Sequence, residues 1–376
     1  MKNAMLLALA GATFLSTTAP AFAGEIYYNA QSQIIGQTST NSSTLGGDSR
    51  YFATDSKYSS VVSLIMKYAD GTGAICSGSL LSDRQSVLTA AHCVSHGQGT
   101  AAPVKTTAYF YNGTDPDKIP SFGGDGVTAI DVSKYFVNSG YTGEIIDQND
   151  IAVLRLGDLA PSYATGYDLY TGPMSGQTFN VTGYGGRSSV GGAVGTNVGT
   201  GVRRQGYNTY DYQIGDSAFN GGLESLLRGT TKTAQTSSIW LADFDNGTTL
   251  NDGGCKLAGY YGVTGSPYCG TGLGASEVIT APGDSGGSSF IDGKISSVTS
   301  FGITFGINYG DFDNKQDQSW GEFSGLVPVN IHSQFILSSM VASVPEPQSW
   351  AMMIVGFGLM GGSIRRSRRL RTAAAA

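Results

Sequence analysis

The chain has 376 residues and a formal net charge of −6 at pH 7, and only 13% of its residues are charged. This acidic, charge-poor composition excludes a protein that binds nucleic acid through a basic surface, because contacts to phosphate groups need clustered lysine and arginine. The length exceeds that of one typical core and predicts more than one packed unit.

Residues 1–23 are predicted to be a secretory signal peptide. Lys2 precedes an apolar run over 4–15, and Ala21-Phe22-Ala23 forms a small-x-small site for signal peptidase. The run is shorter than the ~20 apolar residues of a membrane-spanning helix, so a retained anchor is the weaker interpretation. The mature chain is expected to begin at Gly24.

Residues 24–50 are predicted to be a leader or propeptide. They are rich in serine, threonine, glutamine and asparagine and contain few apolar residues. Such a composition does not bury enough apolar surface to form a core. We therefore expect ordered structure to begin near Tyr51.

The body of the chain is predicted to be all-β. Short runs of β-branched and aromatic residues alternate with glycine, aspartate and asparagine, as in proteins built from many short strands and tight turns. A glycine-rich stretch over 185–206 is expected to be a mobile surface loop. One helical period occurs late in the chain, over 328–340. The runs that predict strands are 61–66, 86–88, 106–111, 151–156, 179–182 and 295–301.

The four cysteines of an exported chain predict two disulfides. Three pairings are possible, and Cys76 with Cys93 and Cys255 with Cys269 close the shortest loops. Crosslinks of this loop size stabilise a fold by about 3 kcal/mol each in the chain-entropy model. Two reduced pairs in the core are the alternative.

Two stretches place an imidazole and a carboxylate beside predicted strands. In LTAAHC a strand runs through two alanines to His92, and in NDIAVLRL Asp150 precedes a strongly apolar strand. A carboxylate that is buried there needs donors. An imidazole Nδ1–H would be one, and the carboxylate would fix the tautomer whose Nε2 accepts a proton from a serine. Alone, each residue would be interpreted as structural.

Ser285 stands in APGDSGGSSF, which contains both Gly-x-Ser-x-Gly and Gly-Asp-Ser-Gly-Gly. The first pattern fits the nucleophile elbow of an α/β-hydrolase, whose acid and histidine follow the serine. His332 is the histidine that follows, but 275–282 lacks a clean apolar strand and the residues after Ser285 start a helix poorly. The possible acids of that alternative are Asp292, Asp311, Asp313 and Asp317.

In chain order, LTAAHC, NDIAVLRL and GDSGG resemble the chymotrypsin-like serine peptidases of the trypsin fold. CSGSLL at Cys76 and VTGYG at Val181 resemble further family segments, and the likeness covers 51–340. It implies an all-β fold of two six-stranded antiparallel Greek-key barrels with a short C-terminal helix. The first barrel is expected over 51–165 and the second over 166–343.

The resemblance implies a catalytic triad. Ser285 would be the nucleophile, His92 the general base and then acid, and Asp150 the carboxylate that orients the imidazole. The backbone N–H groups of Gly283 and Ser285 would form the oxyanion hole, where the loss of one donor costs about 3 kcal/mol.

The resemblance also implies positions that bind substrate. Ile279 is expected at the base of the primary specificity pocket, and Ser300, Phe301 and Gly302 are expected along the substrate backbone. An apolar floor does not pair with arginine or lysine, so we expect cleavage after apolar or small residues. No cofactor and no metal are expected, and the acidic residues of 311–322 are interpreted as a solvated loop.

Activation by cleavage is a further implication of the resemblance. In the family the acid before the serine, here Asp284, pairs with a newly released α-amino group. The chain has no Ile-Val-Gly-Gly, but Arg50-Tyr51 lies about where that terminus belongs. Cleavage after Arg50 is therefore a hypothesis.

Residues 344–371 resemble the PEP-CTERM sorting signal of Gram-negative bacteria. Val344-Pro345-Glu346-Pro347 leads into an uncharged stretch over 350–364 and then five arginines, which should stay cytoplasmic. The resemblance implies export, recognition by an exosortase-type enzyme, and membrane contact only through this transmembrane helix before processing. An ordinary C-terminal anchor is the alternative.

We therefore predict an exported serine endopeptidase that cleaves polypeptides through an acyl-enzyme. Its expected location is the periplasm, the outer surface or the extracellular matrix, and its expected partners are signal peptidase and the exosortase-type enzyme. Two alternatives stay open. One is a catalytically silent trypsin-fold module that binds at the envelope or in the matrix, and the other is an esterase that uses Ser285 with His332.

Overall fold

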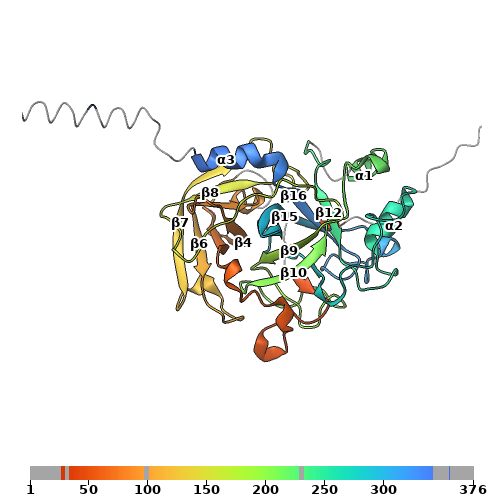
Figure 1. Ribbon diagram of the computed structural model, residues 1–376, viewed down its shortest axis with the longest axis horizontal. Helices are drawn as coiled ribbons and strands as arrows, with labels where there is room; N and C mark the ends of the chain where they lie inside the picture. The colour runs from red at the N-terminus through yellow and green to blue at the C-terminus, as the bar shows by residue number, and fades with distance from the viewer. Residues whose placement is uncertain (1–26, 30–33, 97–100, 228–232, 342–354, 356–376) are drawn as a thin grey trace, which may run out of the picture.

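The computed structural model describes residues 27–29, 34–96, 101–227, 233–341 and 355. A closed barrel and a second sheet lie side by side, and the few helices lie at the periphery (Figure 1). The predicted signal peptide, and the sorting segment apart from Val355, lie outside the described residues. Within the described part of the chain, no helix combines the length and apolar character needed to cross a membrane.

The first unit is a closed, six-stranded antiparallel barrel with the strand order β3-β4-β5-β8-β7-β6. Three consecutive strands pair as a meander, and the next three return so that β6 pairs with β3 and β8 with β5. Leu64, Leu88 and Leu154 are fully buried in its core. The strands are β3 (Val61–Lys67), β4 (Gly73–Leu80), β5 (Ser86–Thr89), β6 (Lys105–Tyr111), β7 (Val127–Val137) and β8 (Ala152–Leu156).

The second unit is a curled half-barrel with seven strands in the order β10-β9-β14-β15-β16-β12-β11, and β1 is added on β15. Among the described residues no strand pairing joins β10 to β11, so the predicted second six-stranded closed barrel is wrong in this detail. Isolated bridges from Phe52 and Glu277 border β10 instead. The strands are β1 (Tyr27–Asn29), β9 (Thr178–Gly183), β10 (Arg204–Thr209), β11 (Tyr212–Gln213), β12 (Trp240–Asp243), β14 (Ser288–Ile291), β15 (Lys294–Thr304) and β16 (Phe323–Pro328).

Part of the leader is packed into this second unit. The short strand β2 (Ile35–Gly36) pairs with β13 (Val278–Ile279), and Ile34 and Ile35 are fully buried. The expectation that order begins near Tyr51 is therefore wrong, because two isoleucines suffice to anchor a polar segment in the core. The predicted unit boundaries, and removal of 24–50 as a propeptide, stay predictions.

In the described part of the chain, three α-helices lie outside the sheets: α1 (Gly222–Leu227), α2 (Gly253–Tyr260) and α3 (Ser333–Val341). The expected short C-terminal helix is confirmed as α3, although 328–332 belong to the end of β16 and a 3₁₀ turn rather than to the helix. Helix α3 packs over β8 of the first barrel, where Ile336 joins the core of that unit (Figure 1). The chain thus returns to the first unit and joins the two.

Both predicted disulfides, Cys76–Cys93 and Cys255–Cys269, are formed. The first joins β4 to the 3₁₀ turn His92–Val94, and the second joins α2 to the following loop. The first crosslink therefore holds the turn of His92 against the first barrel, and the second holds the loop at Cys269 against α2.

Candidate active site

His92 lies on the 3₁₀ turn that follows β5. Ala90 and Ala91 are fully buried, so their small side chains allow the chain to turn close to the barrel. The disulfide between Cys76 and Cys93 ties this turn to β4. Because both cysteines are oxidised, this group of cysteine and histidine side chains offers no thiolate to a metal ion.

Asp150 lies at the turn before β8 and is fully buried. Its Oδ2 is 2.6 Å from His92 Nδ1 and its Oδ1 accepts the His92 backbone N–H at 2.8 Å. Ser300 Oγ also donates to Oδ2, at 2.6 Å. Three donors compensate a carboxylate that has left water. With Nδ1–H donated to Asp150, the ring keeps Nε2 as its proton acceptor.

A second buried acid, Asp147, holds the turn that carries Asp150. Its Oδ2 accepts the backbone N–H of Thr142 at 2.8 Å and the hydroxyl of Thr142 at 2.7 Å, and its Oδ1 accepts Asn149 N–H at 2.8 Å. Burial raises the pKa of Asp147. Our sequence reasoning missed this residue. The available signal was the aspartate itself, whose side chain can accept the backbone N–H two residues later and form an Asx turn.

The turn that bears Ser285 is docked against the first barrel. Ser77 of β4 donates its backbone N–H to the Ser285 carbonyl at 2.8 Å and its hydroxyl to the Gly283 carbonyl at 3.0 Å. Cys93 Sγ lies 3.5 Å from the Ser285 carbonyl oxygen and 3.9 Å from His92 Nε2. The Ser285 carbonyl oxygen of the second unit and His92 Nε2 of the first therefore both lie near Cys93 Sγ.

Two glycines make this docking possible. Gly283 and Gly286 have φ of 107° and 78°, a region that side chains disfavour. A Cβ on Gly286 would lie 2.0 Å from Thr89 Oγ1, and one on Gly283 would lie 2.9 Å from Gly185 Cα. Gly286 is thus required by close approach of the two units, and Gly283 by close approach to Gly185 within the second unit.

Asp284 is a third buried acid of the site. Its Oδ1 accepts the backbone N–H of Gly185 at 2.9 Å. Within the described ranges its Oδ2 has no hydrogen-bond partner. Burial holds the pKa of Asp284 well above its usual range.

The residues predicted to bind substrate lie in two places. Ser300, Phe301 and Gly302 lie on β15, with Ser300 bonded to Asp150 and the Phe301 ring buried in the core against Gly325. The structure therefore leaves only the backbone of Phe301 available to a peptide. Ile279 is fully buried with Ile35, Phe244, Ala281 and Trp320, so its side chain contacts core residues, one of them from the leader.

His332 is held away from any catalytic role by its own hydrogen bonds. Asn138 Nδ2 donates to its Nδ1 at 3.0 Å, and its Nε2 donates to the Gln148 carbonyl at 2.7 Å. Burial lowers the pKa of His332. With both ring nitrogens engaged, this histidine is a structural link, which counts against the esterase alternative.

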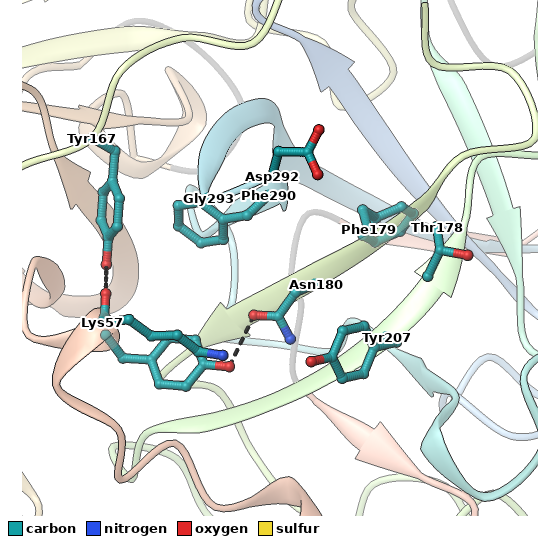
Figure 2. A pocket seen from close by; sticks show the side chains of 10 residues that line it. Lys57, Tyr167, Thr178, Phe179, Asn180, Tyr207, Phe290, Asp292 and Gly293 are labelled. Atoms are coloured by element: carbon teal, nitrogen blue, oxygen red, sulfur yellow. Dashed lines mark hydrogen bonds between the residues drawn. The ribbon is translucent and has the colours of Figure 1, made fainter.

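A cavity of about 330 Å³ lies at the other end of the strands that lead to the site (Figure 2). Tyr58 and Asn180 both line it, and the Tyr58 hydroxyl donates to Asn180 Oδ1 at 3.0 Å. Asp292 and Gly293 also line it, and they form the turn at the end of β14 opposite to Ser285. The cavity contains none of the predicted site residues.

A closed six-stranded barrel beside a curled half-barrel, with histidine and aspartate on the first and serine on the second, defines the trypsin fold. Residues 52–223 match the family model for trypsin, and 343–369 match the PEP-CTERM protein-sorting motif. Residues 52–223 are therefore similar to the trypsin family, and the sorting motif indicates export through an exosortase in Gram-negative bacteria, to the surface or beyond. A comparison with curated proteins gave no match.

Proposed function

We propose that the protein is a serine endopeptidase whose triad is His92, Asp150 and Ser285. The observation that carries this proposal is the buried pair of His92 and Asp150, 2.6 Å apart, beside the docked turn that bears Ser285. The trypsin match ends at residue 223 and does not include the serine, so the assignment of Ser285 depends on this geometry.

In the proposed reaction, Ser285 Oγ attacks the carbonyl carbon of the scissile bond while His92 Nε2 takes the hydroxyl proton. The oxyanion is held by the backbone N–H groups of Gly283 and Ser285. His92 then gives its proton to the leaving amine, and water enters to hydrolyse the acyl-enzyme. Asp150 stays ionised throughout and stabilises the imidazolium.

An edge of β15 supports a polypeptide substrate. Strand β16 takes one edge, and β14 takes the other only as far as Val298. Beyond this point the edge passes Ser300, the partner of Asp150, and pairs with β1 through Asn29 and Gly302. An edge that accepts an antiparallel strand of its own chain offers the backbone groups needed to accept a peptide.

The leader occupies the surfaces that substrate would use, since β1 pairs with the β15 edge and Ile35 of β2 covers Ile279. We infer that the described form is a precursor, and that removal of the leader opens the site. Preference for apolar or small residues before the scissile bond rests on the apolar character of Ile279. A peptide library tests it, and preference for arginine or lysine would overturn it.

The experiment for the activity uses a fluorophosphonate probe and a denatured protein substrate. The secreted protein is expected to be labelled and to cleave, and Ser285→Ala and His92→Ala are expected to do neither. Absence of both labelling and cleavage in every processed form would support a silent binding module instead. Hydrolysis of esters that His332→Ala abolishes and His92→Ala spares would support the esterase.

A further inference from the structure

Five carboxylates converge in the second unit, far along the chain from the triad residues of the first. They form what we call the acidic cluster, and all but Asp211 are buried. Asp243 ends β12, Asp252 caps the N-terminus of α2, and Glu277 precedes β13. The members of the acidic cluster are Asp211, Asp243, Asp245, Asp252 and Glu277.

No basic side chain neutralises this cluster. Within the described residues none of the five carboxylates forms an ion pair with lysine or arginine. Backbone N–H groups satisfy one oxygen each: Gly254 donates to Asp243 Oδ2 at 2.6 Å, and Cys255 donates to Asp252 Oδ1 at 2.7 Å. Several carboxylates that share a buried site without a counter-charge are strongly disfavoured.

One oxygen of the cluster lacks any partner. Asp245 is 3% exposed, and its Oδ1 has no hydrogen bond within the described part of the chain. Its backbone N–H donates to Glu277 Oε1 at 2.7 Å, which fixes the residue in place. Asp245 lines a cavity of about 180 Å³ together with Asp211, Asp243 and Glu277. A buried, unpaired carboxylate oxygen at such a cavity is a suitable ligand for a cation.

The geometry fits a single ion. Ligand oxygens of Asp243, Asp245 and Asp252 all lie within 4.8 Å of one another. Two oxygens bound to the same Ca²⁺ at about 2.4 Å are separated by at most about 4.8 Å. The loop 269–273 lines the same cavity, so its main chain and water are the available sources of further oxygen ligands.

We propose that Asp243 and Asp245, which line this cavity, bind one Ca²⁺ ion together with the neighbouring Asp252. The donor set consists of oxygens alone, which hard cations prefer. The two cysteines nearest the site, Cys255 and Cys269, are oxidised to a disulfide and offer no thiolate to a softer metal. Mg²⁺ demands strict octahedral geometry and keeps its water, so a cluster of carboxylates favours Ca²⁺.

The electrostatics of the cluster agree with this assignment. Burial removes these carboxylates from water, and at this short separation they repel one another. A divalent cation would remove this penalty, since metal binding displaces protons from its ligands. The ion would also tie β12, α2 and the loop 269–273 together.

The test uses the purified full-length protein, treated with EGTA and then titrated with CaCl₂. Equilibrium dialysis with radioactive Ca²⁺ is expected to give one ion per chain, and saturating CaCl₂ is expected to raise the Tm by about 5–10 °C. Asp245→Asn is expected to bind no Ca²⁺ and to show no shift. In EGTA this variant should melt at about the same temperature as the wild type, because a protonated Asp245 and an asparagine are both uncharged and nearly equal in size, so failure to fold and loss of the site are distinguishable.

The matched control is Asp313→Asn, which alters the other acidic segment of the chain, where Asp313 pairs with Lys315 at 2.6 Å. It is expected to bind Ca²⁺ as the wild type does. Absence of binding by the wild type at 10 mM CaCl₂, or unchanged binding by Asp245→Asn, would overturn the proposal. Loss of binding in Asp313→Asn alone would move the site to residues 311–322 and overturn it as well.

Discussion

Asp150 receives three hydrogen bonds, and the one from His92 Nδ1 decides its proposed catalytic role. Asp150→Asn would present an amide to that nitrogen and stabilise the wrong imidazole tautomer. In the template triad of this fold the same change lowers kcat by about 10⁴-fold, and we expect a loss of that order here. Steady-state kinetics measure it, and ¹⁵N NMR of the histidine reports the tautomer.

His332→Gln is the control for this prediction. It removes a buried imidazole that bonds Asn138 and Gln148, so we expect lower stability and unchanged kcat. A variant Asp150→Asn with near-normal kcat would mean that the pair of His92 and Asp150 is structural only.

Gly286 tests how closely the nucleophile turn must approach the barrel. Gly286→Ala is expected to lower the free energy of unfolding by about 2–4 kcal/mol, from left-handed strain of about 1–2 kcal/mol and overpacking against Thr89. Gly293→Ala is the matched control, because Gly293 has φ of 72° but nothing within 4 Å of its Cβ position. Urea unfolding of both variants separates the steric cost from the cost of the left-handed backbone. If both variants lose the same free energy of unfolding, the nucleophile turn does not pack closely against the barrel.

At the residue scale, the motifs that contain the candidate catalytic residues could be recognised in the sequence. The residues that contact them in the fold could not. His92 and Asp150 were predicted because their motifs and that of Ser285 resemble the peptidase family in chain order, and the side chains of His92 and Asp150 do meet. Asp147 was missed because its role is to accept N–H groups of its own turn. Ile279 was predicted to floor a pocket, but its partner Ile35 lies more than two hundred residues away in sequence, where no local pattern reveals the contact.

At the element scale, the leader is the segment for which composition misled most. The pairing of β1 with β15 and of β2 with β13 depends on backbone groups, which any residue supplies, so a polar sequence does not exclude it. Similarly, the glycine-rich stretch 185–206 was expected to be a mobile loop. Much of it is buried, and Gly192 lies against Trp320 and Phe244. Glycine here permits close packing rather than mobility.

Deletion of residues 24–33 is the prediction that follows for the leader. It removes β1 but keeps Ile34 and Ile35 in the core, so the Tm should stay nearly the same. Under the proposed function, kcat/KM for short peptides should rise about tenfold, a step of about 1.4 kcal/mol, because the β15 edge becomes accessible. A chain that begins at Gly24 is the control.

A synthetic peptide of residues 24–36, added to the shortened protein, should inhibit it competitively. An active protein whose kcat/KM does not respond to the deletion would show that β1 does not compete with substrate, while the triad assignment would stand.

At the scale of the whole molecule, the sequence predicted two β units and the short final helix, because alternation of strands and turns repeats throughout the body. It did not predict that the second unit stays open. Closure depends on which distant segments border β10, and Phe52 and Glu277 take that place. The two units are held together by contacts that are equally distant in sequence, such as Ser77 with Gly283 and α3 with β8.

The acidic cluster gives the whole molecule a pH dependence whose sign can be worked out. The pKa values of Asp243 and Glu277 are about 7 and about 8 when folded, above their unfolded values. As pH rises, the unfolded chain loses these protons first. The contribution of the two groups to the free energy of unfolding is therefore fully present below pH ~4, and it falls as pH passes through 7 and 8. Asp211, Asp245 and Asp252 belong to the same cluster and their raised pKa values act in the same direction, and Lys256 offsets Asp252 only in part.

Ca²⁺ should oppose this loss because it binds the deprotonated form, so the stabilisation by CaCl₂ is expected to grow between pH 5 and pH 8. Urea unfolding at each pH, in EGTA and in 10 mM CaCl₂, measures it. The lowered pKa of His332 affects the free energy of unfolding equally in both buffers, so it cancels when the value in EGTA is subtracted from the value in CaCl₂. Glu277→Gln should flatten the curve in EGTA, since it removes one of the titrating groups. If the difference in free energy of unfolding between CaCl₂ and EGTA shrinks as pH rises, the acidic cluster is not coupled to a cation.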